Sequence, residues 1–149
     1  TRELGIGMVP WGPLGGGFLA GKDNPNEKTS EGAGRIATTP GHAEESWEKR
    51  NQSRNWRVME LVERIAGDLN ATPSQVALAY LIAREDVSTV LLGARTMAQL
   101  EDNLGATQVT LPTDALTALD EASRVEARYP YRMIDTYGNR EATEANRVD

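Results

Sequence analysis

The sequence contains no cysteine and a single histidine, His42, among its 149 residues. Without cysteine the chain cannot form disulfides, thiolate nucleophiles or cysteine-ligated zinc. One histidine also excludes a metal site built from two histidines of the same copy, so no metal is expected. No apolar run approaches the roughly 20 residues that a membrane span needs. We therefore expect a cytoplasmic protein with no membrane partner.

The chain also lacks the basic patch that nucleic-acid-binding proteins present, and no nucleic-acid partner is expected. Its formal net charge is −6, and its basic residues are scattered apart from a local group at Lys49, Arg50, Arg54 and Arg57. The length suffices for one domain with a core. Residues 1–5 lack an initiator methionine and read as a helix end in a chain cut in mid-course.

Two short apolar runs, residues 6–11 and 87–92, predict buried strands that each end at a glycine. Apolar periodicity predicts helices over residues 44–69 (with a break near 51–55), 72–83, 96–105 and from 113 onward. Two parallel strands joined by a helical crossover form a βαβ unit. An eight-stranded α/β barrel needs about 250 residues. The chain is therefore the last part of such a barrel or a small open α/β domain.

Two of the predicted helices begin with the same capping signal. Thr72 and Gln75 open the first, with Pro73 suited to the first helical position. This helix is apolar nearly all round, which predicts burial on more than one side. Thr96 and Gln99 open the second. The face of the second helix expected to point inward carries Met97, Leu100 and Leu104.

The first candidate site is the glycine-rich stretch from Trp11 to Lys22. Trp11 ends the first strand, where functional residues of α/β barrels cluster, and its ring could stack on a planar ligand. Gly12 and Gly15–Gly17 would let the backbone approach a ligand, and their amides could meet phosphate oxygens. Lys22 could add a positive charge. The alternative is a tight corner with Trp11 in the core, and the residues alone leave both interpretations open.

The second candidate site runs from Gly93 to Asn103, where a strand gives way to a helix. Free amides and the helix dipole make such a junction suitable for an anion. The planar fork of Arg95 suits a phosphate. Gln99, Asp102 and Asn103 share a helix face and could hydrogen-bond an adenine or a ribose. A plain capped helix with a solvated polar face is the alternative.

Together the two segments resemble the aldo-keto reductase family. The resemblance rests on blocks of sequence in a fixed order, which cover residues 1–123. They are Gly5–Leu14, Gly17–Lys22, Asn55-Trp56, Thr72–Tyr80, Gly93–Thr96, Asn103–Ala106 and Leu119–Ser123.

The resemblance implies the C-terminal part of a (β/α)8 TIM barrel, with strands seven and eight and their helices. Residues 1–123 would form a partial domain that holds NADP, and residues 124–149 a C-terminal loop or tail. Arg95 near the 2′-phosphate would favour NADP over NAD. Gly12 departs from the family, which usually has serine there. The implied cofactor-binding residues are Trp11 at the nicotinamide, Gly12, Pro13, Leu14, Gly15 and Gly16 near the pyrophosphate, Lys22 and Arg35 from the covering loop, and Gly93, Arg95, Gln99, Asp102 and Asn103 at the adenosine end.

The resemblance also implies that the catalytic half is missing. The family's tetrad of aspartate, tyrosine, lysine and histidine lies in the N-terminal half, so no catalytic residue is assigned here. The parent protein would be an NADP(H)-dependent oxidoreductase that reduces an aldehyde or ketone to an alcohol. The alternatives are a regulatory subunit resembling the channel-associated members of the family, or an inactive fragment. Two strands would leave a sheet edge and a helix face uncovered, which could support self-association.

Overall fold

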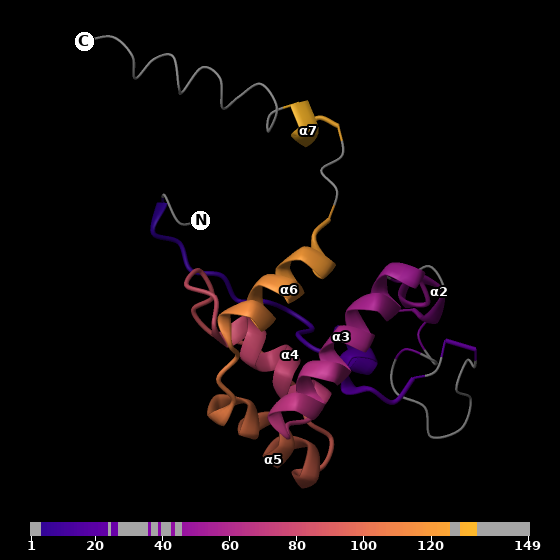
Figure 1. Ribbon diagram of the computed structural model, residues 1–149, viewed down its shortest axis with the longest axis vertical. Coiled ribbons are helices and arrows are strands. Elements are labelled where there is room, and N and C mark those ends of the chain that lie inside the picture. The colour runs from indigo at the N-terminus through magenta and orange to yellow at the C-terminus, as the bar shows by residue number, and fades with distance from the viewer. Residues whose placement is uncertain are drawn as a thin grey trace.

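The computed structural model describes residues 4–23, 25–26, 36, 39, 43, 46–125 and 129–133. Within these ranges the chain is mainly helical, and Figure 1 shows α3, α4 and α6 grouped together with α7 lying apart from them. No helix in the described ranges has the length and apolarity to cross a membrane. The elements in order are η2 (Gly15–Ala20), α2 (Trp47–Arg50), α3 (Ser53–Leu69), α4 (Pro73–Ile82), α5 (Met97–Gly105), η3 (Ala106–Gln108), α6 (Thr113–Ser123) and α7 (Tyr131–Met133).

The predicted break in the first helical region is confirmed, because α2 ends at Arg50 and α3 begins at Ser53. The apolar stripe of α3 faces the core, with Val62 and Ile65 buried. Asn70 ends the helix in the left-handed conformation with φ 51°, a conformation that asparagine tolerates better than most residues.

The capping box of α4 is also confirmed. Thr72 Oγ1 accepts from the Gln75 amide at 3.2 Å, and Gln75 Oε1 accepts from the Thr72 amide at 3.1 Å. Pro73 occupies the start of the helix, where a missing N–H costs nothing. Val76 and Leu78 are both buried although they point in different directions around the helix. The expectation that α4 is covered on more than one side therefore holds.

The core lies between α3, α4 and α6, with η2 and α2 packed at one end. Trp56 makes edge-to-face contacts with Phe18 of η2, at 4.8 Å between ring centroids, and with Trp47 of α2, at 6.3 Å. Because these aromatic contacts span three elements, they fix the glycine-rich stretch to the helical body. The buried apolar members of this core are Phe18, Ile36, Trp47, Met59, Val62, Ile65, Ala66, Val76, Ala79, Leu111 and Leu119.

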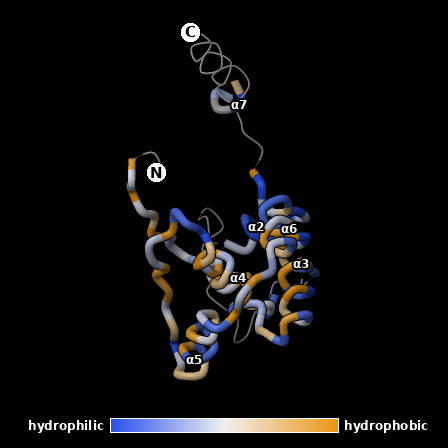
Figure 2. Tube along the Cα trace, turned by 60° about the vertical axis from the view of Figure 1, so that its left-hand side comes forward, coloured by the Kyte–Doolittle hydropathy of each residue, from blue (hydrophilic) through white to orange (hydrophobic). Residues whose placement is uncertain are grey.

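The two segments predicted as buried strands differ most from expectation. Among the described residues their pairing is a single parallel bridge, Met8 to Val87. Trp11 is 76% exposed and Leu91 is 60% exposed, so the predicted burial is wrong. In Figures 1 and 2 the start of the N-terminal segment lies on the side of the molecule away from α3. A parallel sheet needs further strands and helices over both faces, and one bridge supplies neither.

The predicted inward face of α5 is also wrong. Met97 is 67% exposed and Leu104 is exposed too, while the third predicted residue, Leu100, is half-buried. Asn103 is only 6% exposed. The reason is that α5 meets α4 through polar atoms, because Gln75 Nε2 donates to the Asp102 carbonyl at 3.0 Å. This hydrogen bond turns the Asp102–Asn103 side of α5 toward α4 and leaves apolar side chains outside.

Candidate cofactor site

The glycine-rich stretch is a compact series of left-handed turns. Gly12, Gly15, Gly16 and Gly17 have φ values of 62°, 59°, 76° and 105°, which side chains rarely adopt. The Gly15 amide donates to the Gly12 carbonyl at 2.8 Å, and the Gly17 amide donates to the Leu14 carbonyl at 3.0 Å. Two of the four glycine amides therefore close turns within the loop.

The loop stands on the helical core. Phe18 is buried, and Gly21 ends η2 with φ 70°. A Cβ at Gly21 would lie 3.2 Å from Pro73 Cγ and 3.3 Å from Met59 Cε, so the chain passes very close to α3 and α4 at this point. The position of the glycine-rich loop is therefore set by α3 and α4, which follow it much later in the sequence.

Arg50, in the last turn of α2, lies against this loop. A Cβ at Gly15 would be 3.8 Å from Arg50 Cζ and 4.0 Å from its Nη1. Arg50 Nε is buried and has no hydrogen-bond partner. A cationic donor without a partner beside a glycine loop fits an anionic group such as a cofactor phosphate. Sequence reasoning missed Arg50 as a site residue, although the local basic group at 49–57 was a signal.

The remaining predicted residues of this segment are partly or fully exposed to solvent. Trp11 and Lys22 are exposed, while Pro13 and Leu14 are half-buried. Pro13 has no N–H, so it cannot donate to a phosphate. Arg35 lies outside the described residues.

The second segment places its charged residue at a helix start. Gly93 and Arg95 are exposed, and Thr96 caps α5 by accepting from the Gln99 amide at 3.2 Å. Gln99 Oε1 accepts from the Arg95 amide at 2.8 Å, whereas a full capping box would pair it with Thr96. The carboxamide oxygen of Gln99 is therefore engaged in holding the turn that presents Arg95.

Asp102 and Asn103, further along α5, are less exposed to solvent than Gly93 and Arg95. Asp102 is half-buried, and its carbonyl accepts from Gln75. Asn103 is 6% exposed, the lowest exposure among the predicted site residues that the structure describes. Their roles at the adenosine end stay predictions.

The parallel bridge pairs residues that lie just before the two segments, three residues before Trp11 and six before Gly93. The Met8 amide donates to the Asp86 carbonyl at 2.7 Å, and the Ser88 amide donates to the Met8 carbonyl at 2.9 Å. The chains therefore leave the bridge in the same direction, one toward Trp11 and the other toward Gly93. This arrangement is what a shared site at one edge of a sheet needs.

A polar cluster of Tyr80, Arg84 and Asp120, here called the Asp120 cluster, joins α4 to α6. Asp120 Oδ1 accepts from Tyr80 Oη at 2.5 Å and from Arg84 Nη1 at 2.7 Å. These hydrogen bonds, from Tyr80 first and Arg84 second, lower the pKa of the Asp120 carboxyl. Burial, followed by the hydrogen bond to Asp120, raises the pKa of Tyr80. Neighbouring Arg54 also reaches α6, donating to the Ser123 carbonyl. The cluster lies outside both candidate segments and acts as a structural tie.

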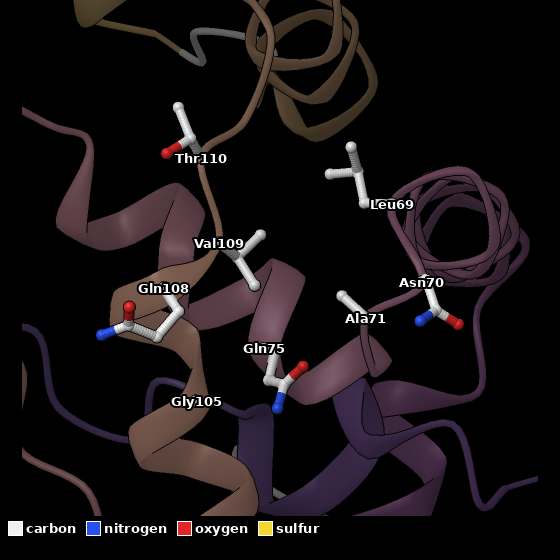
Figure 3. A pocket seen from close by; sticks show the side chains of 8 residues that line it. All are labelled: Leu69, Asn70, Ala71, Gln75, Gly105, Gln108, Val109 and Thr110. Atoms are coloured by element: carbon white, nitrogen blue, oxygen red, sulfur yellow. The ribbon is translucent and has the colours of Figure 1, made fainter.

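A pocket of about 410 Å³ opens between the end of α3, α4 and η3 (Figure 3). Gln75 lies on its wall, but both ends of its carboxamide are engaged, by Thr72 and by Asp102. No lining residue belongs to either candidate segment. Nor does any group of three metal-ligating side chains occur in the part of the chain described here. The lining residues are Leu69, Asn70, Ala71, Gln75, Gly105, Gln108, Val109 and Thr110.

Comparison with known proteins gives consistent matches. The model of the aldo/keto reductase family matches residues 1–124. The aldo-keto reductase yakc, NADP(+), of Schizosaccharomyces pombe is 34% identical over 134 residues, which are 87% of this chain and 37% of that protein. The probable aldo-keto reductase 1 of Glycine max is 32% identical, over 81% of this chain and 33% of its own length. The uncharacterized oxidoreductase YrpG of Bacillus subtilis is 29% identical, over 81% of this chain and 33% of its own length. The chain thus spans about a third of the length of these curated relatives.

Proposed function

The chain belongs to the aldo/keto reductase family, and we propose that it supplies the cofactor-holding part of an NADP(H)-dependent oxidoreductase. The reaction would be reduction of an aldehyde or ketone to an alcohol. The family implies a (β/α)8 barrel, and the chain would provide strands seven and eight with their helices. The relatives named as aldo-keto reductases or an oxidoreductase support an enzymatic role, and one name specifies NADP(+).

The observation that carries this proposal is the parallel bridge between Met8 and Val87. The glycine-rich loop and the helix N-terminus, which are both suited to phosphates, follow this bridge in the same chain direction. The exposed apolar side chains of Ile6, Val9 and Leu91 add support, because strands in a complete barrel would bury them.

In the proposed site each residue has a distinct task. NADPH, when bound, supplies the hydride. Trp11 stacks on the nicotinamide, the backbone around Gly12–Gly16 holds the pyrophosphate, and Lys22 adds charge to the covering segment. Arg95 binds the 2′-phosphate from the start of α5. No residue of the chain is proposed as the proton donor to the carbonyl oxygen, and no catalytic role is assigned to the chain.

A titration of the chain with NADPH and NADH tests this assignment. The protein has three tryptophans, and Trp47 and Trp56 pack together in the core while Trp11 is exposed. Stacking of nicotinamide on Trp11 should therefore quench part of the tryptophan fluorescence. In Trp11→Phe this quenching should disappear, while calorimetry should still detect NADPH binding. Absence of NADPH binding by calorimetry would contradict the proposal, as would quenching that survives in Trp11→Phe.

Arg95→Gln tests the preference for NADP. A hydrogen bond to a charged group contributes about 1.5–3 kcal/mol, so the substitution should weaken NADPH binding by roughly 10-fold to 100-fold and leave NADH binding unchanged. Arg64→Gln is the matched control, because Arg64 is exposed on α3 and lies in neither segment. Equal affinity of the unmodified chain for NADPH and NADH would remove the basis of the Arg95 assignment. Turnover of a carbonyl substrate by this chain alone would contradict the expectation that the catalytic half is missing.

A further inference from the structure

Arg50 presents a charged donor that the helical body does not use. Its Nε is buried, and no hydrogen-bond partner is present for it. Within the described part of the chain no carboxylate forms an ion pair with it; the ion pair there joins Arg84 to Asp120. Burying a donor without a partner costs free energy, so a residue in this state points to a ligand that completes it.

The position of the guanidinium identifies the kind of ligand. Its Cζ and Nη1 would lie 3.8 and 4.0 Å from a Cβ at Gly15, which is ordinary van der Waals contact and places the guanidinium directly beside the glycine-rich loop. Gly15 has φ 59° and belongs to the series of turns that follows Trp11. A planar cation beside a chain of glycine peptide groups provides the donors that oxygen-rich anions prefer.

We propose that Arg50 binds the pyrophosphate of the dinucleotide that the glycine-rich loop holds. This inference rests on the proposed function and adds a cationic contact from α2, an element outside both candidate segments. The pyrophosphate is favoured over the 2′-phosphate because Gly15 lies four residues after Trp11, the residue assigned to nicotinamide, whereas Arg95 begins the other segment.

Two features hold Arg50 in place independently of a ligand. Asn55 Nδ2 donates to the Arg50 carbonyl at 3.0 Å, and the Asn51 amide donates to the Trp47 carbonyl at 2.7 Å, which closes the short helix. Neither interaction uses the guanidinium. Substitution of the Arg50 side chain should therefore leave the backbone of α2 intact.

The test compares Arg50→Gln and Arg50→Lys with Arg57→Gln, which removes the same charge from an exposed position on α3. Binding of NADPH and of NADH to the complete chain is measured by calorimetry at several salt concentrations. Arg50→Gln should weaken both nucleotides by the same factor, about 10-fold or more, and reduce the salt dependence of binding. Arg50→Lys should recover part of the affinity, and Arg57→Gln should change nothing.

Unchanged affinity in Arg50→Gln would overturn the inference, and so would a loss confined to NADPH, which would assign Arg50 to the 2′-phosphate. A second measurement does not need a variant that folds. The Nε–H resonance of Arg50 is followed by NMR in the unmodified chain while inorganic pyrophosphate is added. A saturable shift that chloride at equal ionic strength does not produce supports the anion site; no shift overturns it.

The calorimetric and NMR measurements distinguish failure of the cofactor proposal from failure of the Arg50 proposal. If the chain binds neither nucleotide but pyrophosphate shifts the Arg50 resonance, the cofactor proposal fails while the anion site stands. If both nucleotides bind and the Arg50 substitutions have no effect, the cofactor proposal stands and Arg50 is excluded from it.

Discussion

The Asp120 cluster joins α4 to α6 through side chains, so Asp120→Asn measures how much this polar contact stabilises the helical body. The substitution keeps the shape of the side chain and an oxygen that can accept from Tyr80. It removes the charge that strengthens the hydrogen bonds from Tyr80 and Arg84. Glu121→Gln is the matched control, because Glu121 is the exposed neighbour of Asp120 on α6.

The geometry limits the size of the effect. A single nitrogen, Arg84 Nη1, donates to both Asp120 oxygens, at 2.7 and 2.9 Å, which is weaker than a fork with two donors. The two side chains are each 39% exposed, so the ion pair counts as a surface pair worth about 0.2–1 kcal/mol. The substitution keeps a neutral hydrogen bond from Tyr80 and loses only the extra strength that a charged acceptor gives, about 0.5–1 kcal/mol. Asp120→Asn should therefore lower the free energy of unfolding by about 1–2 kcal/mol.

The effect should depend on pH in a defined direction. The pKa of Asp120 in the folded protein lies below its ordinary value of 3.8. Because the unfolded chain takes up the proton first, the stability that Asp120 contributes is complete above the ordinary pKa and is lost as the pH falls through the folded pKa. The difference between the unmodified protein and Asp120→Asn should be constant near neutral pH and shrink below about pH 4.

Urea unfolding followed by circular dichroism at several pH values measures this difference, provided that the transition is cooperative. Tyr80→Phe and the double variant complete a cycle that isolates the Tyr80–Asp120 interaction. A neutral-pH difference below about 0.3 kcal/mol, which is within the error expected for independent sites, would refute the reasoning. A difference that persists undiminished in acid would show that the charge of Asp120 is not its source.

Two further predictions concern the start of α4, and urea unfolding checks both. Thr72→Ala removes the capping hydrogen bond to the Gln75 amide and should cost about 1 kcal/mol. Thr117→Ala at an exposed position inside α6 should be neutral or stabilising, because alanine has the higher helix propensity. Gly105→Ala should gain up to about 1 kcal/mol of helix propensity. A Cβ there would nevertheless overlap Gln75 Nε2 and disturb its hydrogen bond to Asp102, so we expect net destabilisation. In a Gln75→Ala background the same substitution should become stabilising; a stabilising effect in both backgrounds would show that Gln75 moves aside at no cost.

The helices could be predicted from the sequence because their signals are local. Thr72, Pro73 and Gln75 lie within four residues, and the stripe on α3 repeats with the helical period. Capping and periodicity depend on neighbours in the chain, so they survive whatever the rest of the fold does. Met97 and Leu104 were misplaced because helical period does not reveal which side of α5 meets α4. The side of α5 that faces α4 is the one that accepts a hydrogen bond from the Gln75 carboxamide, and Gln75 belongs to another helix.

The two apolar runs show the limit of such reasoning. Apolar sequence predicts that a segment can be buried, but the burial itself depends on partners from elsewhere in the fold. Met8 and Val87 make one bridge, and Leu91 remains exposed. The contact between Arg50 and Gly15 is likewise tertiary, because 35 residues separate them in the sequence. A basic residue in a short basic group gives no sign of which loop it will face.

The two ends of the proposed site differ in how firmly the structure holds them. The glycine-rich loop rests on Phe18 and Gly21, which pack against α3 and α4, and Arg50 lies beside it with its Nε already buried. Trp11 precedes this loop in the sequence and is 76% exposed. Groups that are ordered before binding lose little entropy when a ligand arrives, whereas exposed groups must be ordered by it. The phosphates should therefore contribute most of the affinity of this chain for a dinucleotide, and the nicotinamide end should gain its contacts only where other strands cover Trp11.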